Sequence, residues 1–466
     1  MLISLQLVVQ GEGGVPATVT EIAQFERDDL DVGSLGLHLA EAKSLLGRLQ
    51  RTMVTAQVAE AVARTSMCPT CGARLACKGH HHLVFRSAFG RLSIDSPRLY
   101  PCRRCQGDAP TFSPIANCLA ERVSPELQYL EVKFAALTSY GLTVSVLQEV
   151  LPLDHVLAAG SIRRQVTTLG RRLEAEQATD ARQQAEVAAS IRSPEIHEPS
   201  PVRAVGIDGG YLRRAGHRRR QDGWFEVIVG KSLRDQDDAG HSFAYVHKLE
   251  RRPADRMWNF LLREGVQPSQ PVTFLSDGGD TVRFAQLGFG DRGEYVLDWF
   301  HIAMRVQNLE QMIKGRPAHS DGPSNTALIK TLHGAKWHLW HGCPFPALRC
   351  LESLSRDLDP EASPEEAKLL GKLEEFIVYL DNNRHFIVNY GDRYRHGEPI
   401  ASGFVESAVN QVISKRFVKR QQMTWRPRHA HNLLQIRTAV LNNQFRSYVE
   451  RWYPSIARDE NHRLAA

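Results

Sequence analysis

Two pairs of cysteines constrain the fold of this chain more than any other feature of its sequence. They are Cys68-Pro-Thr-Cys71 and Cys102-Arg-Arg-Cys105, and 30 residues separate them. Each pair places two thiolates close enough together to bind one tetrahedral zinc ion, and Gly72 allows a tight turn beneath the metal. We therefore expect Cys68, Cys71, Cys102 and Cys105 to hold a structural Zn²⁺ ion. The alternatives are a redox-active pair or two accidental pairs.

The segment between the two pairs accounts for a spacing longer than the usual ~15–20 residues. Apolar residues recur at alternate positions on both sides of a break at 88–90, and this pattern predicts a β-hairpin. We expect residues 67–120 to form a zinc-ribbon-like module, which zinc would stabilise. Cys77 and the run His80-His81-His82 are interpreted as a surface loop, and substitution for one of the metal ligands is the alternative. Ordinary thiols are expected at Cys118, Cys343 and Cys350.

The composition of the 466-residue chain is globular, with 24% charged and 42% hydrophobic residues. At roughly 100–200 residues per domain, this length predicts about two to four domains. The first residues lack the basic stretch of a secretory signal, and no run of ~18 apolar residues predicts a membrane span. Eight cysteines are too few for a disulfide scaffold in a chain of this length. We expect a cytoplasmic protein.

The first half of the chain is divided by its pattern of apolar residues. Residues 1–66 predict a strand followed by two helices, at 37–49 and 53–64. Residues 121–192 predict three helices that begin at Ser124-Pro125-Glu126 and break near Gly141. Such a group suits a helix-turn-helix-like DNA-binding region, although a plain helical spacer is the alternative. The proline-rich segment 193–201 is the predicted linker.

The second half has the pattern of an α/β domain. Short β-rich runs and one intervening helix at 254–263 predict a core whose first part is 202–300. Residues 301–400 are helical and polar, and a last helical block occupies 401–466. The chain is therefore expected to be a multidomain α+β protein. The predicted core strands are 202–208, 225–229, 243–249, 272–277 and 295–298.

Three acidic residues stand where acid is unexpected. Asp208 and Asp277 each end a predicted strand and precede two glycines, and Glu406 lies at the start of a helix that has no other acid. A carboxylate at a strand end faces the crevice at the edge of a sheet. Two such strands and a helix can therefore bring three carboxylates together on one or two Mg²⁺ ions. The alternative for each Asp alone is a turn residue, because Asp-Gly is a common turn sequence.

Basic residues are concentrated near two of these acids, although the net charge is only +6. No Asp or Glu occurs at 407–449, and a second basic cluster follows Asp208. A basic stretch without neutralising acids suits a nucleic-acid backbone held over a metal site; a solvated charged face is the alternative. The candidate DNA-binding residues are Arg213, Arg214, Lys415, Arg416, Lys419, Arg420, Trp425 and Arg426.

The segment Asp298-Trp-Phe-His301 is a further candidate. Asp298 ends the fifth predicted strand and His301 begins the next helix, so both are expected near the crevice of the sheet. His301 could position a phosphate or assist proton transfer. A buried histidine whose hydrogen bonds are satisfied is the alternative.

Taken together, these motifs resemble the bacterial insertion-sequence transposases of the ISKra4 group, which are DDE enzymes related to the Mutator-like types. The resemblance covers most of the chain. In the second half it rests on four segments: Val205-Gly-Ile-Asp208-Gly-Gly-Tyr, Leu275-Ser-Asp277-Gly-Gly-Asp280, Leu297-Asp298-Trp-Phe-His301-Ile and Gly403-Phe-Val-Glu406-Ser-Ala-Val-Asn410-Gln. The tail Lys419-Arg-Gln-Gln-Met-Thr-Trp425 also fits. In the first half it rests on 35–43, the cysteine pairs, Phe89-Gly90 and Pro97-Arg98-Leu-Tyr100.

The resemblance implies an RNase H-like catalytic core in which Asp208, Asp277 and Glu406 are the acidic triad. It also implies that 301–400 is an all-helical insertion before the Glu406 helix, and that Asp298 and His301 belong to the x-x-H motif of Mutator-like relatives. Asp298 or Asp280 is the alternative second acid. The implied cofactors are two catalytic Mg²⁺ ions, for which Mn²⁺ could substitute, and structural Zn²⁺.

The implied activity is cleavage of transposon ends and their joining to target DNA. Its partners would be the terminal repeats, the target DNA and further copies of the chain, with no membrane, and its location would be the nucleoid region of a bacterial cytoplasm. Two other functions remain open. One is a zinc-containing, sequence-specific DNA-binding protein without catalysis, and the other is a nuclease that cuts without joining.

Overall fold

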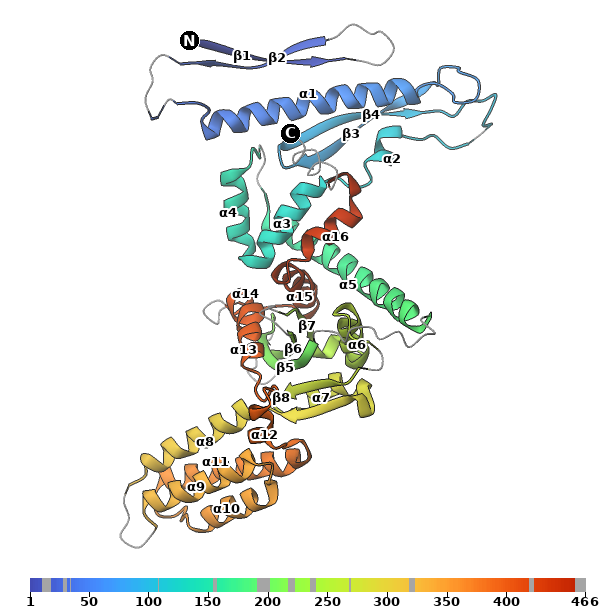
Figure 1. The fold of residues 1–466 in the computed structure, drawn as a ribbon. Helices are drawn as coiled ribbons and strands as arrows, with labels where there is room; N and C mark the ends of the chain where they lie inside the picture. Colours follow the sequence, from blue (N-terminus) through green and yellow to red (C-terminus); the bar gives the residue numbers. More distant parts are fainter. Residues whose placement is uncertain are drawn as a thin grey trace. The chain divides into compact units, whose positions relative to one another are not determined.

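The computed structural model divides the chain into two compact units (Figure 1). The first comprises 1–166 and 445–466, and the second comprises 167–444. The predicted linker 193–201 and the candidate residues Lys419 and Arg420 lie outside the described residues. The structure describes residues 1–10, 18–27, 32–33, 35–107, 109–153, 157–190, 202–216, 223–234, 240–267, 270–317, 323–418 and 423–456.

The first unit begins with an antiparallel pair of strands, β1 (Leu2–Val9) and β2 (Thr18–Glu26), followed by helix α1 (Leu39–Thr65). The two helices predicted at 37–49 and 53–64 are in fact one. No glycine or proline lies between the two predicted segments, so nothing there interrupts the helix.

The predicted β-hairpin between the cysteine pairs is confirmed. Strands β3 (Cys77–Ser87) and β4 (Gly90–Leu99) pair antiparallel around a two-residue turn. Leu83, Leu92 and Ile94 face inward and pack with apolar residues of α1 and of the short helix α2 (Pro114–Cys118). The histidine run was expected in a loop, but it lies within β3, because cross-strand pairing with β4 extends as far as Cys77.

Helices α3 (Pro125–Leu137) and α4 (Tyr140–Val150) follow the hairpin. The predicted start is confirmed, because Ser124 Oγ accepts a hydrogen bond from Leu127 N (3.3 Å). The break lies at 138–139 rather than at Gly141, because Ser139 caps the next helix by accepting from Leu142 N (3.3 Å).

Two further helices complete the described part of the first unit. Helix α5 (Ala159–Ser190) begins in this unit and continues into the second. Helix α16 (Phe445–Trp452) also belongs to the first unit, although its sequence was assigned to the core. The ring of Phe445 stacks on that of Tyr129 in α3 with centroids 5.7 Å apart, and this aromatic contact accounts for the difference.

A buried glutamate in α3 makes the stability of the first unit depend on pH. Glu131 is fully buried, neither of its carboxylate oxygens has a hydrogen-bond partner among the described residues, and its nearest cation, Arg86 Nη1, is 3.8 Å away. Burial raises the pKa of Glu131 to about 6, against the opposing effect of Arg86. Because the folded pKa exceeds the ordinary value of 4.5, this group's contribution to stability is greatest below about pH 4.5. It is lost as the pH rises through about 6.

We therefore predict that Glu131→Gln raises the free energy of unfolding at pH 8 by about 2 kcal/mol and has little effect at pH 4.5. Urea unfolding of the full chain at both pH values, in a buffer without EDTA, measures the difference. Glu126→Gln is the matched control, because Glu126 is an exposed residue of the same helix. Equal effects of the two substitutions at pH 8 would contradict the prediction.

The second unit contains a five-stranded mixed sheet with the strand order β7-β6-β5-β8-β9. Three strands pair antiparallel, and two further strands run parallel to β5. The first three are β5 (Val202–Arg213), β6 (Trp224–Arg234) and β7 (Ser242–Val246), and the last two are β8 (Val272–Ser276) and β9 (Gly293–Leu297).

Helices cover both faces of this sheet. Helices α6 (Pro253–Arg263) and α7 (Asp280–Gln286) pack on one face, where Ile207 and Ile228 are buried. Helix α13 (Gly403–Val409) packs against β5 and β6 on the other face, and α15 (Pro427–Leu441) packs against β7. A π-helical turn at Asn410–Ser414 and the short α14 (Lys415–Phe417) follow α13.

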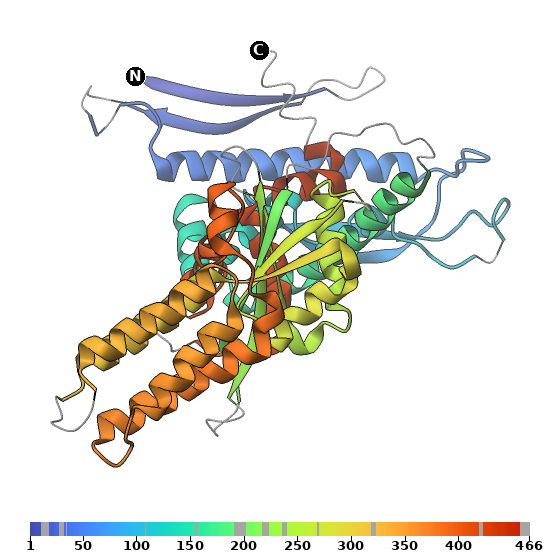
Figure 2. The same ribbon diagram turned by 60° about the horizontal axis from the view of Figure 1, so that its bottom comes forward.

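A group of helices stands between β9 and α13, as predicted for 301–400 (Figure 2). Its buried core consists of apolar side chains from these helices together with Leu275 and Leu297 of the sheet. No helix in the described parts of the chain combines the length and apolar character needed to cross a membrane. The helices are α8 (Trp299–Lys314), α9 (Asn325–Trp340), α10 (Pro344–Arg356), α11 (Pro364–Asn383) and α12 (Tyr390–Arg395).

Candidate functional sites

Asp208 lies where β5 loses one of its two neighbours. Parallel pairing with β8 stops at Ile207 and Ser276, but antiparallel pairing with β6 continues to Arg213. Asp208 was expected to end its strand; it lies within β5 because β6 is long enough to extend the ladder. Its side chain is half-buried at the point where the sheet narrows.

The glycines around Asp208 allow a helix to approach the strand. A Cβ atom on Gly206 would lie 2.1 Å from Val405 Cγ2, and one on Gly210 would lie 2.5 Å from Ile413 Cδ1. Side chains alternate along a strand, so Asp208 shares the face of these two glycines. Helix α13 therefore lies directly on β5 at this point, with Glu406 in its first turn.

Asp277 follows β8 directly. Its Oδ1 accepts a hydrogen bond from Gly279 N (2.9 Å), and the backbone at Gly278 is left-handed (φ +79°). A Cβ atom on Gly278 would lie 2.3 Å from Asn383 Oδ1 at the end of α11. The turn after β8 is therefore shaped by the helical insertion as well as by its own glycines.

The structure brings Asp208 within electrostatic range of both other predicted acids, Asp277 and Glu406. Burial raises the pKa of Asp208, and the charges of Asp277 and Glu406 raise it further, whereas the Gly209 N–H and His301 lower it. Within the described residues, these carboxylate oxygens do not form a group whose ligand atoms all lie within 4.8 Å of one another. The three acids thus share one region of the sheet, although their oxygens are not all close enough together to form a single group of metal ligands.

Asp298 joins the two ends of the helical insertion. It is fully buried and caps α8, and its Oδ1 accepts from Phe300 N (2.8 Å) and from Ser402 N (3.1 Å). Its Oδ2 accepts from the hydroxyl of Ser402, one turn before Glu406. Burial raises the pKa of Asp298, and these hydrogen bonds lower it. Asp298 therefore has structural partners at both oxygens.

The other alternative acid and the histidine occupy different environments. Asp280 has an 89% exposed side chain, 3.9 Å from Arg283, so it lies on the surface. His301 Nε2 lies 3.6 Å from Asp298 Oδ2 and has no hydrogen-bond partner in the described part of the chain. His301 is therefore near the acids, with its buried Nε2 beside Asp298 but beyond hydrogen-bond distance.

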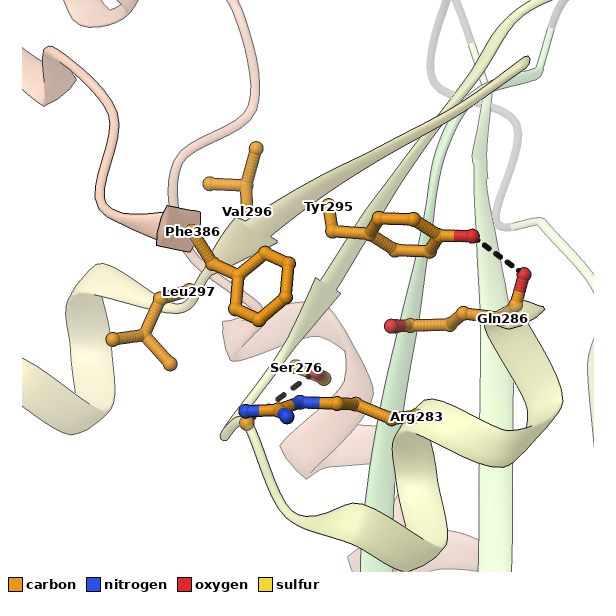
Figure 3. Close-up of a pocket in the computed structure, with 8 residues that line it drawn as sticks. Ser276, Arg283, Gln286, Tyr295, Val296, Leu297 and Phe386 are labelled. Atoms are coloured by element: carbon orange, nitrogen blue, oxygen red, sulfur yellow. Dashed lines mark hydrogen bonds between the residues drawn. The ribbon is translucent and has the colours of Figure 1, made fainter. Parts of the chain in front are cut away.

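A small, mostly apolar cavity lies behind the Asp277 turn (Figure 3). Its volume is about 80 Å³, and Arg283, Tyr295 and Phe386 are among its lining residues. The guanidinium of Arg283 lies 4.8 Å from the ring centroid of Phe386 and donates a hydrogen bond to Asn383. These contacts join α7, β9 and the segment after α11, and so they support the turn that carries Asp277.

Sequence analysis missed the contribution of α8 and α11 to this region. Arg305 lies one turn after His301, and its guanidinium is 4.2 Å from the ring centroid of Tyr379. The charges of Asp277 and Asp298 act on the Tyr379 phenol. The spacing of His301 and Arg305 places both on one side of a helix, but nothing in the sequence indicates that Tyr379 lies beside them.

Four of the candidate DNA-binding residues are exposed, namely Arg213, Arg214, Lys415 and Arg426. Trp425 pairs with the end of β5, where Trp425 N donates to Arg213 O (2.8 Å). The segment that carries Arg426 therefore lies beside Arg213 and Arg214.

Two other candidates are buried, and their assignment as surface contacts is wrong. Arg416 is 2% exposed and Trp425 is 6% exposed. The Arg416 guanidinium lies 5.2 Å from the Trp425 ring centroid, and Trp425 Nε1 donates to Phe417 O (3.0 Å). Both side chains are buried because they pack against each other and against Phe417, so neither is available to a phosphate or a base.

The four cysteines form a second candidate site, in the first unit. Their sulfur atoms all lie within 4.8 Å of one another, and within the described ranges no other group of three or more His, Cys, Asp or Glu side chains does so. Each pair ends in a turn closed by a left-handed glycine, Gly72 (φ +67°) or Gly107 (φ +58°). The cluster could hold a metal ion such as zinc.

The backbone around the cysteines favours thiolates. The N–H groups of Cys71 and Thr70 lower the pKa of Cys68 to about 6. Hydrogen bonding from Cys71 and the other thiols raises the pKa of Cys105, because the four groups compete for the same protons. A divalent cation removes this competition by binding the thiolate forms.

Comparison with models of known protein families gives no match, and no curated protein sequence matches the chain. The two sites are therefore interpreted from their own residues and chemistry.

Proposed function

We propose that this chain is a DNA transposase, similar to those of the ISKra4 group, with an RNase H-like catalytic core. The observation that carries the proposal is that Asp208 lies within electrostatic range of both Asp277 and Glu406, although three distant segments of the chain supply these acids. Paired or grouped carboxylates at the edge of a sheet are typical of metal-dependent phosphoryl transfer.

The strand arrangement supports the RNase H-like assignment. Three antiparallel strands are followed by two strands parallel to the first. One acid lies on the first strand, one follows the fourth, and one lies on the helix after the insertion. The positions of the three acids relative to the strands and the insertion support the proposed core.

The donor atoms of the acidic site suit Mg²⁺, or Mn²⁺ in its place, because these ions prefer carboxylate oxygens. Asp208, Asp277 and Glu406 would hold the ions, and their mutual repulsion is what bound cations would neutralise. When bound, the metal ions would activate the attacking oxygen and stabilise the leaving one.

The other residues would orient the DNA. His301, whose Nε2 lies 3.6 Å from Asp298 Oδ2, would position a phosphate or assist proton transfer beside the acids. Arg213, Arg214, Lys415 and Arg426 would bind phosphates along the DNA backbone. The four cysteines would hold structural Zn²⁺ in a zinc-ribbon-like module, which with α3, α4 and α5 would recognise the terminal sequence.

The reaction would have two steps. Hydrolysis of a phosphodiester at the end of the element would free a 3′-hydroxyl, and that hydroxyl would then attack a phosphodiester of the target DNA. Both ends of the element must be brought together for joining, so the chain would assemble as a homo-oligomer on DNA.

The test uses the full chain, Mg²⁺, a duplex that carries the element's end, and a supercoiled target plasmid. We expect nicked ends and joined products, and we expect neither with EDTA or with a duplex of scrambled sequence. Binding without cleavage would favour a DNA-binding protein, and cleavage without joining would favour a nuclease. Terminal inverted repeats and a duplicated target in the flanking DNA would support transposition.

A further inference from the structure

The helical insertion presents unpaired polar groups to the acidic site. His301 and Arg305 lie one turn apart on α8, and Tyr379 lies on α11. The Arg305 guanidinium is 4.2 Å from the Tyr379 ring centroid, a distance typical of a cation–π contact. Both residues are half-buried, so this contact lies at the boundary between the core of the insertion and the solvent.

The Tyr379 hydroxyl has no hydrogen-bond partner among the described residues, although its oxygen is shielded from solvent. A buried hydroxyl without a partner is costly, at roughly 1–3 kcal/mol. Burial raises the pKa of Tyr379, Arg305 lowers it, and the charges of Asp277 and Asp298 raise it further. The phenol is therefore protonated, with an O–H to donate near the acids.

Arg305 makes no ion pair or hydrogen bond with any described residue. A guanidinium usually binds carboxylates or phosphates in a planar, bidentate arrangement. Here its contact is the face of an aromatic ring, which leaves its N–H donors unused. The guanidinium and the phenol thus lie together, and their donors have no acceptor among the described residues.

We propose that Arg305 and Tyr379 bind a DNA phosphate beside the carboxylate site, so that the helical insertion forms part of the DNA-binding surface. This inference rests on the proposed function and names residues of the insertion as ligands of the same substrate. A phosphodiester supplies the missing acceptor, because its two non-bridging oxygens, which share one negative charge, can accept from the guanidinium and from the phenol O–H together. Arg305 would also compensate the negative charge of the phosphodiester near the acids.

Conservative variants separate DNA binding from packing. Tyr379→Phe keeps the ring under Arg305 and removes only the O–H, whereas Arg305→Lys keeps the charge and removes the planar fork. Arg305→Gln removes the charge. The matched controls are Tyr394→Phe and Arg349→Gln, which alter exposed residues of α12 and α10 in the same insertion.

The measurements are the cleavage rate of the end duplex and the salt dependence of its binding. We expect Tyr379→Phe and Arg305→Lys to slow cleavage by about 10- to 100-fold, the usual effect of losing a hydrogen bond to a charged group. We expect Arg305→Gln to lower the slope of log K against log salt by about 1. Loss of packing alone would alter the unfolding temperature but not this slope.

Wild-type cleavage rates and an unchanged slope in these variants would overturn the inference and leave the proposed function intact. If instead the wild-type chain fails to cleave the end duplex, the proposed function itself is wrong. Should Arg305→Gln fail to fold, the rates of Tyr379→Phe and Arg305→Lys still decide the question.

Discussion

Asp208→Asn is expected to reduce DNA strand cleavage by on the order of 10³-fold or more while increasing the stability of the fold. The substitution removes a metal-binding charge that the proposed reaction needs. It also removes a half-buried charge next to two others, because Asp277 and Glu406 raise the pKa of Asp208. The same opposition of activity and stability is typical of functional sites.

The measurement pairs a cleavage assay in Mg²⁺ with chemical unfolding at pH 8 in a buffer free of divalent cations. Asp280→Asn is the control, because Asp280 has an 89% exposed side chain and lies close to the turn that carries Asp277. It should cleave normally and leave the free energy of unfolding within about 0.5 kcal/mol of wild type. An Asp208→Asn chain that cleaves at the wild-type rate would show that the acidic group is not the catalytic site.

Substitution of Asp298 is expected to lower the stability of the fold, whereas substitution of Asp208 is expected to raise it. Asp298→Ala removes a helix cap and leaves Ser402 without its partner, so it should lower the free energy of unfolding by about 2–4 kcal/mol. It should also impair cleavage, since Ser402 begins the helix that positions Glu406. If Asp277→Asn cleaves normally and Asp298→Asn is both stable and inactive, Asp298 is the second acid.

Much of the second unit could be predicted from local patterns. The five β-rich runs and the helix at 254–263 are present because apolar alternation and run length are properties of neighbouring residues. Asp208 was predicted to end its strand, and that prediction is wrong, because β5 continues through Gly209 and Gly210 to Arg213. Gly206 and Gly210 leave room for Val405 and Ile413, which the local sequence cannot indicate because these partners are far along the chain.

Contacts that local sequence cannot indicate also explain why two candidates in the basic stretch are buried. Charge and aromatic content predicted that Arg416 and Trp425 would bind DNA, but both are buried, because the two side chains pack against each other. Tyr379 was missed for a related reason, because an isolated tyrosine in a polar helix carries no local pattern. Its relation to Asp277 arises only when the insertion folds back on the sheet.

The grouping of the four cysteines could be predicted because metal binding requires a fixed spacing within each pair. This requirement does not depend on the rest of the fold. The hairpin between them then brings the two pairs together, and their sulfur atoms lie within 4.8 Å of one another. The apolar cluster that surrounds them is small, with Cys68, Leu75, Leu99 and Cys102 as its buried members and Phe112 packed against them. So small a core needs a further source of stability.

Removal of zinc is therefore expected to unfold the cysteine module, since structural zinc contributes about 10 kcal/mol or more to small domains. The purified chain should contain one zinc ion, and a strong chelator or Cys102→Ser should remove it. Binding of the end duplex should then be lost, because the module would recognise the terminal sequence.

Binding of zinc should also weaken as the pH falls, because protons compete for the four thiolates. The control is Cys118→Ser, which alters an exposed, free cysteine outside the cluster. It should retain the zinc, the unfolding profile and DNA binding. Metal analysis, near-UV circular dichroism and a DNA-binding assay together measure these effects. A chain that contains no zinc and binds the duplex equally well after Cys102→Ser would show that the four thiols stabilise the module without a metal.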